Sequence, residues 1–378
     1  MSQMFDYENL RLIWWALLGI LLIGFAVLDG FDLGTAIILP FVAKSDLERR
    51  IVLNTVGPVW EGNQVWFILG GGAIFAAWPA LYAASFSGFY LAMFLVLAAL
   101  ILRPVGFKFR SKLNAPAWRR TWDWALFVGG LVPSLVFGVA FGNLFLGVPF
   151  GFDDDLRMHS SISLVSLLNP FSLLAGLVSL SMIVLHGAAW LNLKTERGLQ
   201  ARARRLMPYA ALAFVVCFGL AGLWLSQMDG YRIAGAIAYD GPSNPLAKTV
   251  LRVHQSWMAL TPAKSALWVA EALALTGALG AAFFRKRPLS AFIWSALVPA
   301  ATIATAGFAL FPFLLPSSLE PSASLTIWDA SSSRLTLAIM LSVVALILPV
   351  VLIYTAIAYR VLRGPVRASD IEGSKSAY

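Results

Sequence analysis

The stretch LLGILLIGFAVLDGFDLG, residues 17–34, decides the fold class. It begins as an unbroken apolar run and ends in two carboxylates, Asp29 and Asp32. Together with the apolar residues that flank it, the run exceeds the roughly 20 residues that a helix needs to cross a bilayer. The sequence therefore predicts a membrane-spanning helix with two acids at a depth where lipid would otherwise surround them. Acids in such positions are rare and usually functional.

The overall composition is that of a chain that crosses the membrane many times. Of its 378 residues, 59% are hydrophobic and only 12% are charged, whereas soluble domains are about 25% charged. Long apolar runs recur, without the short alternating segments of a membrane β-barrel. The net charge of +9 comes from basic clusters between apolar runs, which is typical of cytoplasmic loops and does not indicate a nucleic-acid partner. The single cysteine, Cys217, lies in an apolar run, as a packing residue would.

The chain is predicted to be one all-α polytopic membrane domain, 1–378, with about nine transmembrane helices. Short loops join spans one to four and spans five to eight, which favours two four-helix bundles with one peripheral helix. The segment 227–262 is rich in Gly, Pro and Asn and is expected to form an ordered loop outside the membrane. The predicted spans are 9–40, 51–74, 79–102, 122–147, 163–192, 206–227, 263–284, 289–315 and 335–360.

The distribution of basic residues orients these spans. It places the N-terminus in the periplasm and the C-terminus in the cytoplasm of a bacterial inner membrane. The second span is the weakest, because Glu61 and its polar neighbours interrupt it. Without that span, Lys44, Arg49 and Arg50 would be exported, which the positive-inside rule disfavours. The count of nine therefore rests on charge.

Three acids are predicted to meet inside the membrane. Asp29 lies roughly 16 Å from the cytoplasmic end of span one and Glu61 roughly 15 Å into span two, at about 1.5 Å per residue. Because neighbouring spans would place these carboxyls in one cavity, we predict a proton path from the cytoplasm through Asp32 and Asp29 to Glu61. The alternative is that the acids cap helix kinks or pair with Arg103. The residues expected to support the path are Trp60, Asn63, Gln64 and Arg103.

Other ionisable residues give weaker signals. A haem inside a helical bundle needs His or Met ligands, but His186 in span five has no second histidine at its depth, because His159 and His254 lie in outer loops. A hydrogen-bonded packing role is predicted for His186. Lys264 and Glu271 lie about 10 Å apart along one face of span seven, too far for a direct pair, and their role stays open. No catalytic residue and no metal site is predicted in this chain.

Eight short segments occur in an order that is specific to one family. They are GFDLG (30–34), VWEGNQVW (59–66), RPVGFKFRSK (103–112), GNLFLGVPF (142–150), LLNPFSLLAGL (167–177), SNPL (243–246), FPFLLPSS (311–318) and SLTIWDASSSRLTL (324–337). Together they closely resemble subunit II of the cytochrome bd-type quinol oxidases, and the resemblance covers nearly the whole chain.

This resemblance implies a role in aerobic respiration. The family belongs to bacterial terminal oxidases that oxidise quinol, reduce O2 to water and generate a proton motive force without pumping. It implies a partner, subunit I, that carries haem b and haem d and that this chain stabilises. A bound quinone of structural role in this chain, contacts with membrane lipid, and small single-helix subunits in the complex are also implied. The family's proton path falls on Asp29, Trp60 and Glu61, where Glu61 replaces the usual aspartate and shifts the carboxyl by about 1.5 Å.

Two other functions fit the same acids. A proton-coupled secondary transporter also carries acids near the bilayer midplane, but it has two related halves around a substrate site and needs no haem partner. A purely structural scaffold for subunit I would instead keep full turnover after Glu61→Gln.

Overall fold

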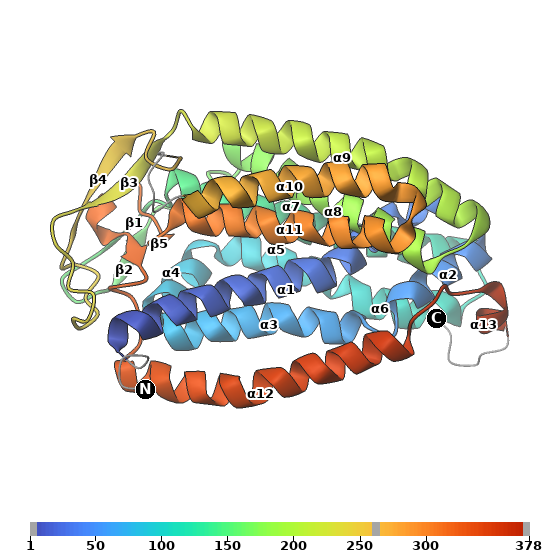
Figure 1. Ribbon diagram of the computed structural model, residues 1–378, viewed down its shortest axis with the longest axis horizontal. Coiled ribbons are helices and arrows are strands. Elements are labelled where there is room, and N and C mark those ends of the chain that lie inside the picture. Colours follow the sequence, from blue (N-terminus) through green and yellow to red (C-terminus); the bar gives the residue numbers. More distant parts are fainter. Residues whose placement is uncertain (1–5, 259–264, 373–378) are drawn as a thin grey trace.

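The structure, a computed structural model, describes residues 6–258 and 265–372 and is mostly helical. Long helices lie side by side along one axis, and three small sheets lie at one end (Figure 1). Lys264 falls outside the described residues. The helices are α1 (Tyr7–Val42), α2 (Asp46–Val56), α3 (Trp60–Ala77), α4 (Pro79–Gly88), α5 (Tyr90–Leu100), α6 (Leu102–Phe109), α7 (Pro116–Leu146), α8 (Pro170–Lys194), α9 (Arg197–Leu225), α10 (Ser265–Phe283), α11 (Pro288–Leu310), α12 (Arg334–Val361) and α13 (Ala368–Glu372).

The three sheets are antiparallel pairs of strands. The pair β3–β4 falls in the segment 227–262, so the expected ordered loop is confirmed for its described part. The pairs are β1 (Phe150–Phe152) with β2 (Met158–Ser160), β3 (Asp229–Ala234) with β4 (Thr249–His254), and β5 (Phe313–Leu315) with β6 (Leu325–Thr326).

Eight helical segments of the described residues are long and apolar enough to cross a membrane. The second predicted span is not among them, because Glu61, Asn63 and Gln64 at the start of α3 lower its mean hydropathy. α3 nevertheless packs against α1 and runs alongside it (Figure 1). With α3 included, the described chain makes nine helical passes, as the distribution of charge predicted.

The helices form the two predicted bundles. α1, α3 and α5 pack with α7, while α8, α9, α10 and α11 pack with one another. α12 lies at the periphery against α1 and α3, as the predicted ninth span (Figure 1). The bundles join where α1 crosses α8, because Gly34 and Gly187 let the two backbones approach closely. A Cβ atom on Gly34 would collide with the carbonyl oxygen of Ile183.

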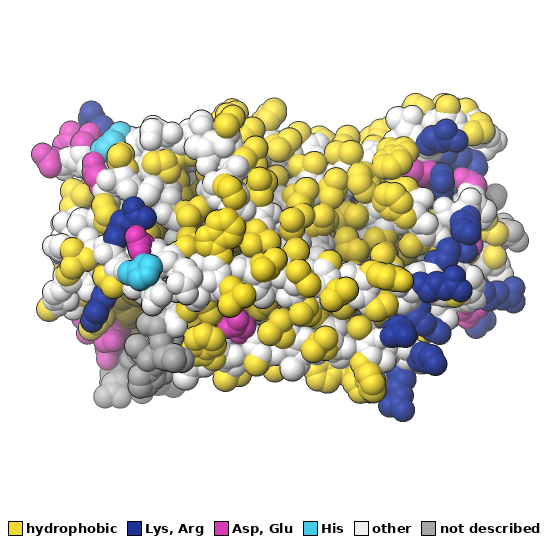
Figure 2. Space-filling view, turned by 90° about the horizontal axis from the view of Figure 1, so that it is seen from above, with side chains coloured by type: hydrophobic (Ala, Val, Ile, Leu, Met, Phe, Trp, Pro, Cys, Tyr) yellow, Lys and Arg dark blue, Asp and Glu magenta, His cyan; other side chains and the backbone are white. Residues whose placement is uncertain are grey.

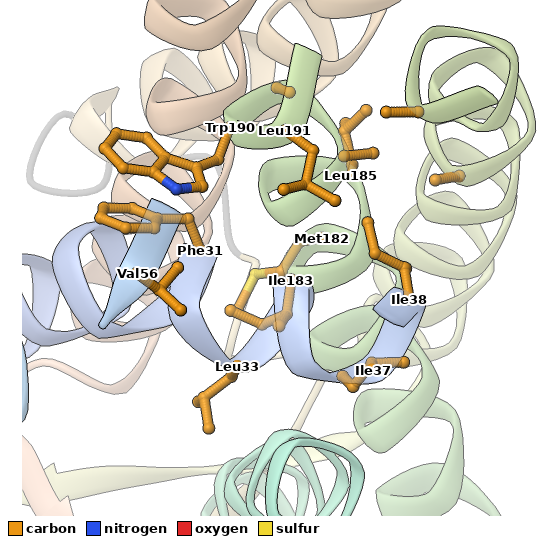
Figure 3. Close-up of a cluster of buried hydrophobic side chains, with 14 of the residues drawn as sticks. Phe31, Leu33, Ile37, Ile38, Val56, Met182, Ile183, Leu185, Trp190 and Leu191 are labelled. Carbon is orange, nitrogen blue, oxygen red and sulfur yellow. The ribbon is translucent and has the colours of Figure 1, made fainter. Parts of the chain in front are cut away.

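Apolar side chains from both bundles fill the space around this crossing. Figure 3 shows Phe31 of α1 beneath Trp190 of α8, with Ile183 on the same side of α1, whereas Leu33 and Ile37 point to the other side of α1. The rings of Phe31 and Trp190 are stacked, with centroids 4.0 Å apart. The core therefore holds the acid-bearing half of α1 rigidly against the second bundle.

Several predicted spans have wrong boundaries, and the cause is local chain chemistry. Span 79–102 is divided into α4, α5 and α6, the first of which begins at Pro79, where a missing N–H costs nothing. Span 163–192 begins only at Pro170, because the side chain of Asn169 caps α8 by accepting a 2.8 Å hydrogen bond from the Ser172 N–H. Span 289–315 ends at Leu310, and the residues after it form β5.

The two ends of the molecule differ in charge. Figure 2 shows dark-blue side chains gathered at the end opposite the strands, and this end, defined by the loops 43–45, 110–115, 195–196 and 284–287, is called the basic end below. The strands mark the other end, called the strand end. Here burial lowers the pKa of Lys248 and raises the pKa of Asp329, although the two groups form a 2.8 Å ion pair.

Candidate functional site

A fully buried ion pair joins α1 to α6. Arg103 donates from Nη1 to Asp29 Oδ2 at 2.9 Å and from Nη2 to Asp29 Oδ1 at 2.7 Å. Both side chains have 0% of their surface exposed. Taking two charges out of water is costly, and only such two-pronged geometry recovers that cost. The alternative that these acids pair with Arg103 is therefore confirmed for Asp29.

Asp32 makes this site unbalanced in charge. Its Oδ2 lies 3.9 Å from Arg103 Nη2 and accepts a 2.8 Å hydrogen bond from Asn63 Nδ2. Its Oδ1 has no hydrogen-bond partner among the described residues. One guanidinium thus faces two carboxylates in a region where an uncompensated charge is expensive. A proton bound by the pair of carboxylates removes the excess charge, so the site is suited to take up and release a proton.

A chain of hydrogen bonds leads from Asp32 towards the basic end. Asn63 Oδ1 accepts a 2.7 Å hydrogen bond from the hydroxyl of Tyr359. Tyr359 is half-buried and lies near the C-terminal end of α12. We call Asp29, Asp32, Asn63, Arg103 and Tyr359 the buried polar cluster. Four helices supply these five described residues. Tyr359 is the only one of the five that is not buried.

Glu61 lies outside this cluster. Its side chain is exposed, whereas Asn63, next but one along α3, is buried against Asp32. Residues two apart on a helix point in nearly opposite directions, so α3 turns Asn63 inwards and Glu61 outwards. Glu61 is the second residue of α3, not the tenth of a continuous span, and the prediction that Glu61 and Asp29 share a cavity is wrong.

The other supporting residues lie around the cluster in different ways. Trp60 is buried and stacks on Phe107 of α6, with ring centroids 5.5 Å apart. Gln64 is half-buried. Tyr359 is not distinguished in the sequence, because a tyrosine near the end of a membrane helix is typical of an interfacial anchor.

An apolar cavity of about 200 Å³, partly open to the surface, lies between the two bundles. Side chains of α1, α7, α8, α9, α10 and α11 line it. Nearly all of them are apolar, such as Phe137, Met182 and Phe218. The one ionisable lining residue of the described chain is Glu271 on α10, which is half-buried and whose Oε2 has no hydrogen-bond partner among the described residues. The lining of the cavity is therefore suited to an apolar molecule with a polar group near Glu271.

Comparison with known proteins identifies the family. The sequence matches the family "Cytochrome bd terminal oxidase subunit II" over residues 10–362. The chain belongs to this family. It is 49% identical over 374 residues to a protein of Haemophilus influenzae named probable cytochrome oxidase subunit 2, covering 98% of this chain and 99% of that one. It is 48% identical over 372 residues to the cytochrome bd-I ubiquinol oxidase subunit 2 of Escherichia coli, with 98% of each chain covered.

A solved structure shares the fold of this subunit II. A chain in the structure of the bd oxidase from Geobacillus thermodenitrificans matches with a TM-score of 0.66, covering 94% of this chain and 97% of that one at 17% identity. The predicted family and the all-α membrane fold are thus confirmed. The chain is a multi-pass protein of the bacterial inner membrane and part of a quinol:O2 oxidoreductase, which replaces the transporter alternative.

The histidines of this subunit II are already engaged in other contacts. His186 is fully buried, with Nδ1 2.9 Å from Ser295 Oγ and Nε2 2.9 Å from the carbonyl oxygen of Val27. His159 and His254 are exposed at the strand end, and each lies beside a carboxylate. The hydrogen-bonded role predicted for His186 agrees with this geometry, since a haem iron would have to displace one of these contacts.

Proposed function

We propose that this chain serves its oxidase by conducting protons and by stabilising the haem-bearing subunit I, with no electron chemistry of its own. Haem b and haem d, which would carry electrons to O2, are assigned to subunit I, because both ring nitrogens of the buried His186 are occupied here. The generation of a proton motive force without pumping then requires that the protons used to form water arrive from the cytoplasm while the protons of quinol are released on the periplasmic side.

The observation that carries this proposal is the excess carboxylate of the buried polar cluster. Tyr359 and Asn63 form a chain of hydrogen bonds from the basic end to Asp32, and Asp32 shares Arg103 with Asp29. The amide of Asn63 orients Asp32, and water beside it would carry the protons. By the positive-inside rule the basic end faces the cytoplasm, with the N-terminus in the periplasm. Protons would thus enter from the cytoplasm at Tyr359 and be held by the two aspartates.

We assign the exposed face of α3 to the contact with subunit I. A carboxylate at this depth cannot face lipid without a large cost, yet Glu61 is exposed in this chain. The same helix exposes Val65, Ile68 and Phe75, whose surfaces suit a packed interface. Covered by subunit I, Glu61 would accept protons at the boundary between the subunits.

Replacement of Glu61 by glutamine tests this assignment. We expect turnover of quinol with O2 to fall about tenfold, less than for a buried proton donor, because water can partly replace an exposed carboxyl. Glu61→Asp keeps the acid and should retain most of the turnover. An oxygen electrode gives the rates, and the haem spectrum checks that the complex is assembled. Full turnover of assembled Glu61→Gln would favour the scaffold role instead.

The apolar cavity is the proposed site of a structural quinone. An isoprenoid chain fits its apolar lining, and the unpartnered Oε2 of Glu271 offers a polar contact for the ring oxygens. Bound there, the quinone would supply a redox-active ring, but this chain's residues would only bind and enclose it. Lys264, the other residue considered with Glu271, lies outside the described residues, and small single-helix subunits remain a proposal from family resemblance.

Filling the cavity should expel this quinone. Ala221 lines the cavity, whereas its neighbour Leu220 is 51% exposed on the outer face of α9. Ala221→Phe is expected to reduce the quinone that co-purifies with the complex about tenfold, because overpacking costs about 1–3 kcal/mol. Leu220→Phe is the matched control and should leave the quinone content unchanged. Solvent extraction and chromatography measure it, and equal content in both variants would contradict the assignment.

A further inference from the structure

The basic residues of the basic end fall into two sets. In the first bundle several arginines pair with acids: Arg110 Nε lies 2.6 Å from Asp123, and Arg119 Nη1 lies 2.6 Å from Asp46. The second set lies in the second bundle and is called the second-bundle patch: Arg204, Arg205, Arg285, Lys286 and Arg287. Among the described residues, no carboxylate oxygen lies within 4.0 Å of a basic nitrogen of this patch.

A single buried amide organises the second-bundle patch. Asn192 of α8 is 0% exposed. Its Oδ1 accepts a 3.2 Å hydrogen bond from Arg204 Nε, and its Nδ2 donates a 2.9 Å hydrogen bond to the carbonyl oxygen of Arg285. Arg285 also donates from Nη1 to the carbonyl oxygen of Ala282 at 3.0 Å, at the end of α10. Asn192 thus orients the guanidinium group of Arg204 and ties it to the backbone of the turn that carries Arg285.

The surface next to this patch is apolar. Tyr209 on α9, Phe283 on α10 and Leu289 on α11 are 72%, 78% and 61% exposed. Each lies within two turns of a basic residue of the patch along its own helix or turn. Figure 2, which views the molecule from the α9 side, shows a band of yellow side chains that adjoins the dark-blue end. A ligand that suits both surfaces has an anionic head and apolar chains.

We propose that the second-bundle patch binds the headgroup phosphate of an anionic phospholipid, whose acyl chains lie on Tyr209, Phe283 and Leu289. Basic pockets between membrane helices commonly recognise such headgroups. The planar guanidinium of Arg204, which Asn192 orients, also matches the oxygens of a phosphate. The positive-inside bias accounts for an excess of basic residues here, but it needs no buried Asn192 to orient them. An acidic soluble protein would leave the apolar half of the surface unused.

Titration of the delipidated oxidase complex with phosphatidylglycerol tests this site. The readout is bound lipid by native mass spectrometry, with phosphatidylcholine as the neutral comparison. Arg204→Gln with Arg285→Gln should weaken the binding of phosphatidylglycerol about thirty-fold, given about a fivefold contribution from each basic residue. The matched control is Arg360→Gln with Arg363→Gln, two exposed residues at the end of α12 that remove the same charge. It should change the binding by no more than about twofold.

A third variant separates orientation from charge. Asn192→Ala keeps every basic residue but releases Arg204, and it should weaken binding about fivefold. Unchanged binding in Asn192→Ala, or an equal loss in the control pair, would overturn the proposal in favour of unspecific attraction by net charge. Inorganic phosphate that competes at the same concentration as the lipid would also overturn it, because the acyl chains would then contribute nothing.

Discussion

Replacing Arg103 by methionine is expected to prevent accumulation of the assembled oxidase. Arg103 is the only cation within 4.0 Å of Asp29 or Asp32 among the described residues, and all three side chains are buried. Its removal leaves two buried carboxylates without a cation beside them, which costs about 3–5 kcal/mol. A loss of this size approaches the whole stability of many proteins. The yield of haem-containing complex from membranes, and its melting temperature in detergent, measure the effect.

Two further variants identify the cause of this loss. Arg103→Lys keeps the charge but cannot form both hydrogen bonds to Asp29, so its stability should be intermediate. Arg103→Met combined with Asp29→Asn removes both members of the ion pair and should recover part of the yield, as expected for coupled residues. A single Arg103→Met variant that is as stable as the unmodified complex would show that the ion pair does not stabilise the fold.

Replacing Asp32 by asparagine should instead leave an assembled but slow enzyme. The amide oxygen can still accept the hydrogen bond from Asn63 Nδ2, and Arg103 keeps both bonds to Asp29. The buried polar cluster then loses the acid that we propose binds and releases protons. Turnover with quinol and O2 should therefore fall about a hundredfold. The oxygen electrode measures this rate at equal haem content.

Thr35 provides the matched control for Asp32. It is buried on α1 almost one turn further along, 1% exposed, and its hydroxyl has no hydrogen-bond partner among the described residues. Thr35→Val replaces a hydroxyl by a methyl group of similar size at a position outside the buried polar cluster. The turnover of this variant should match that of the unmodified complex. An equal loss in both variants would show that α1 tolerates no change here, and would remove the special role of Asp32.

The candidate site was partly predictable from the sequence. Asp29 and Asp32 stand out because acids within an apolar run are costly, and Arg103 follows as a possible partner for the same reason. The direction in which Glu61 points was not predictable. Both faces of α3 carry apolar residues, so hydropathy does not show which face meets α1. Residues two apart on a helix point in nearly opposite directions, so Glu61 faces outwards where Asn63 faces inwards. Tyr359 was missed because it contacts Asn63 across almost the whole length of the chain.

The fold was predictable at the level of passes and bundles, because apolar length and basic loops are local properties of the chain. The helix breaks were not. Apolar length predicts continuous helices, whereas Pro79 begins a new helix and Pro170 follows a capping asparagine. The close crossing of α1 and α8 depends on Gly34 and Gly187, which are far apart in the sequence and show their complementarity only when the bundles are assembled.

The most direct test of the proton path is the uptake of protons when the fully reduced oxidase reacts with O2, followed with a pH-sensitive dye on the side of the basic end. We expect Asp32→Asn to lose the fast phase of proton uptake while the spectrum of the haems stays unchanged. Proton uptake at the unmodified rate in assembled Asp32→Asn would contradict the role of the buried polar cluster as the route by which protons reach the oxidase.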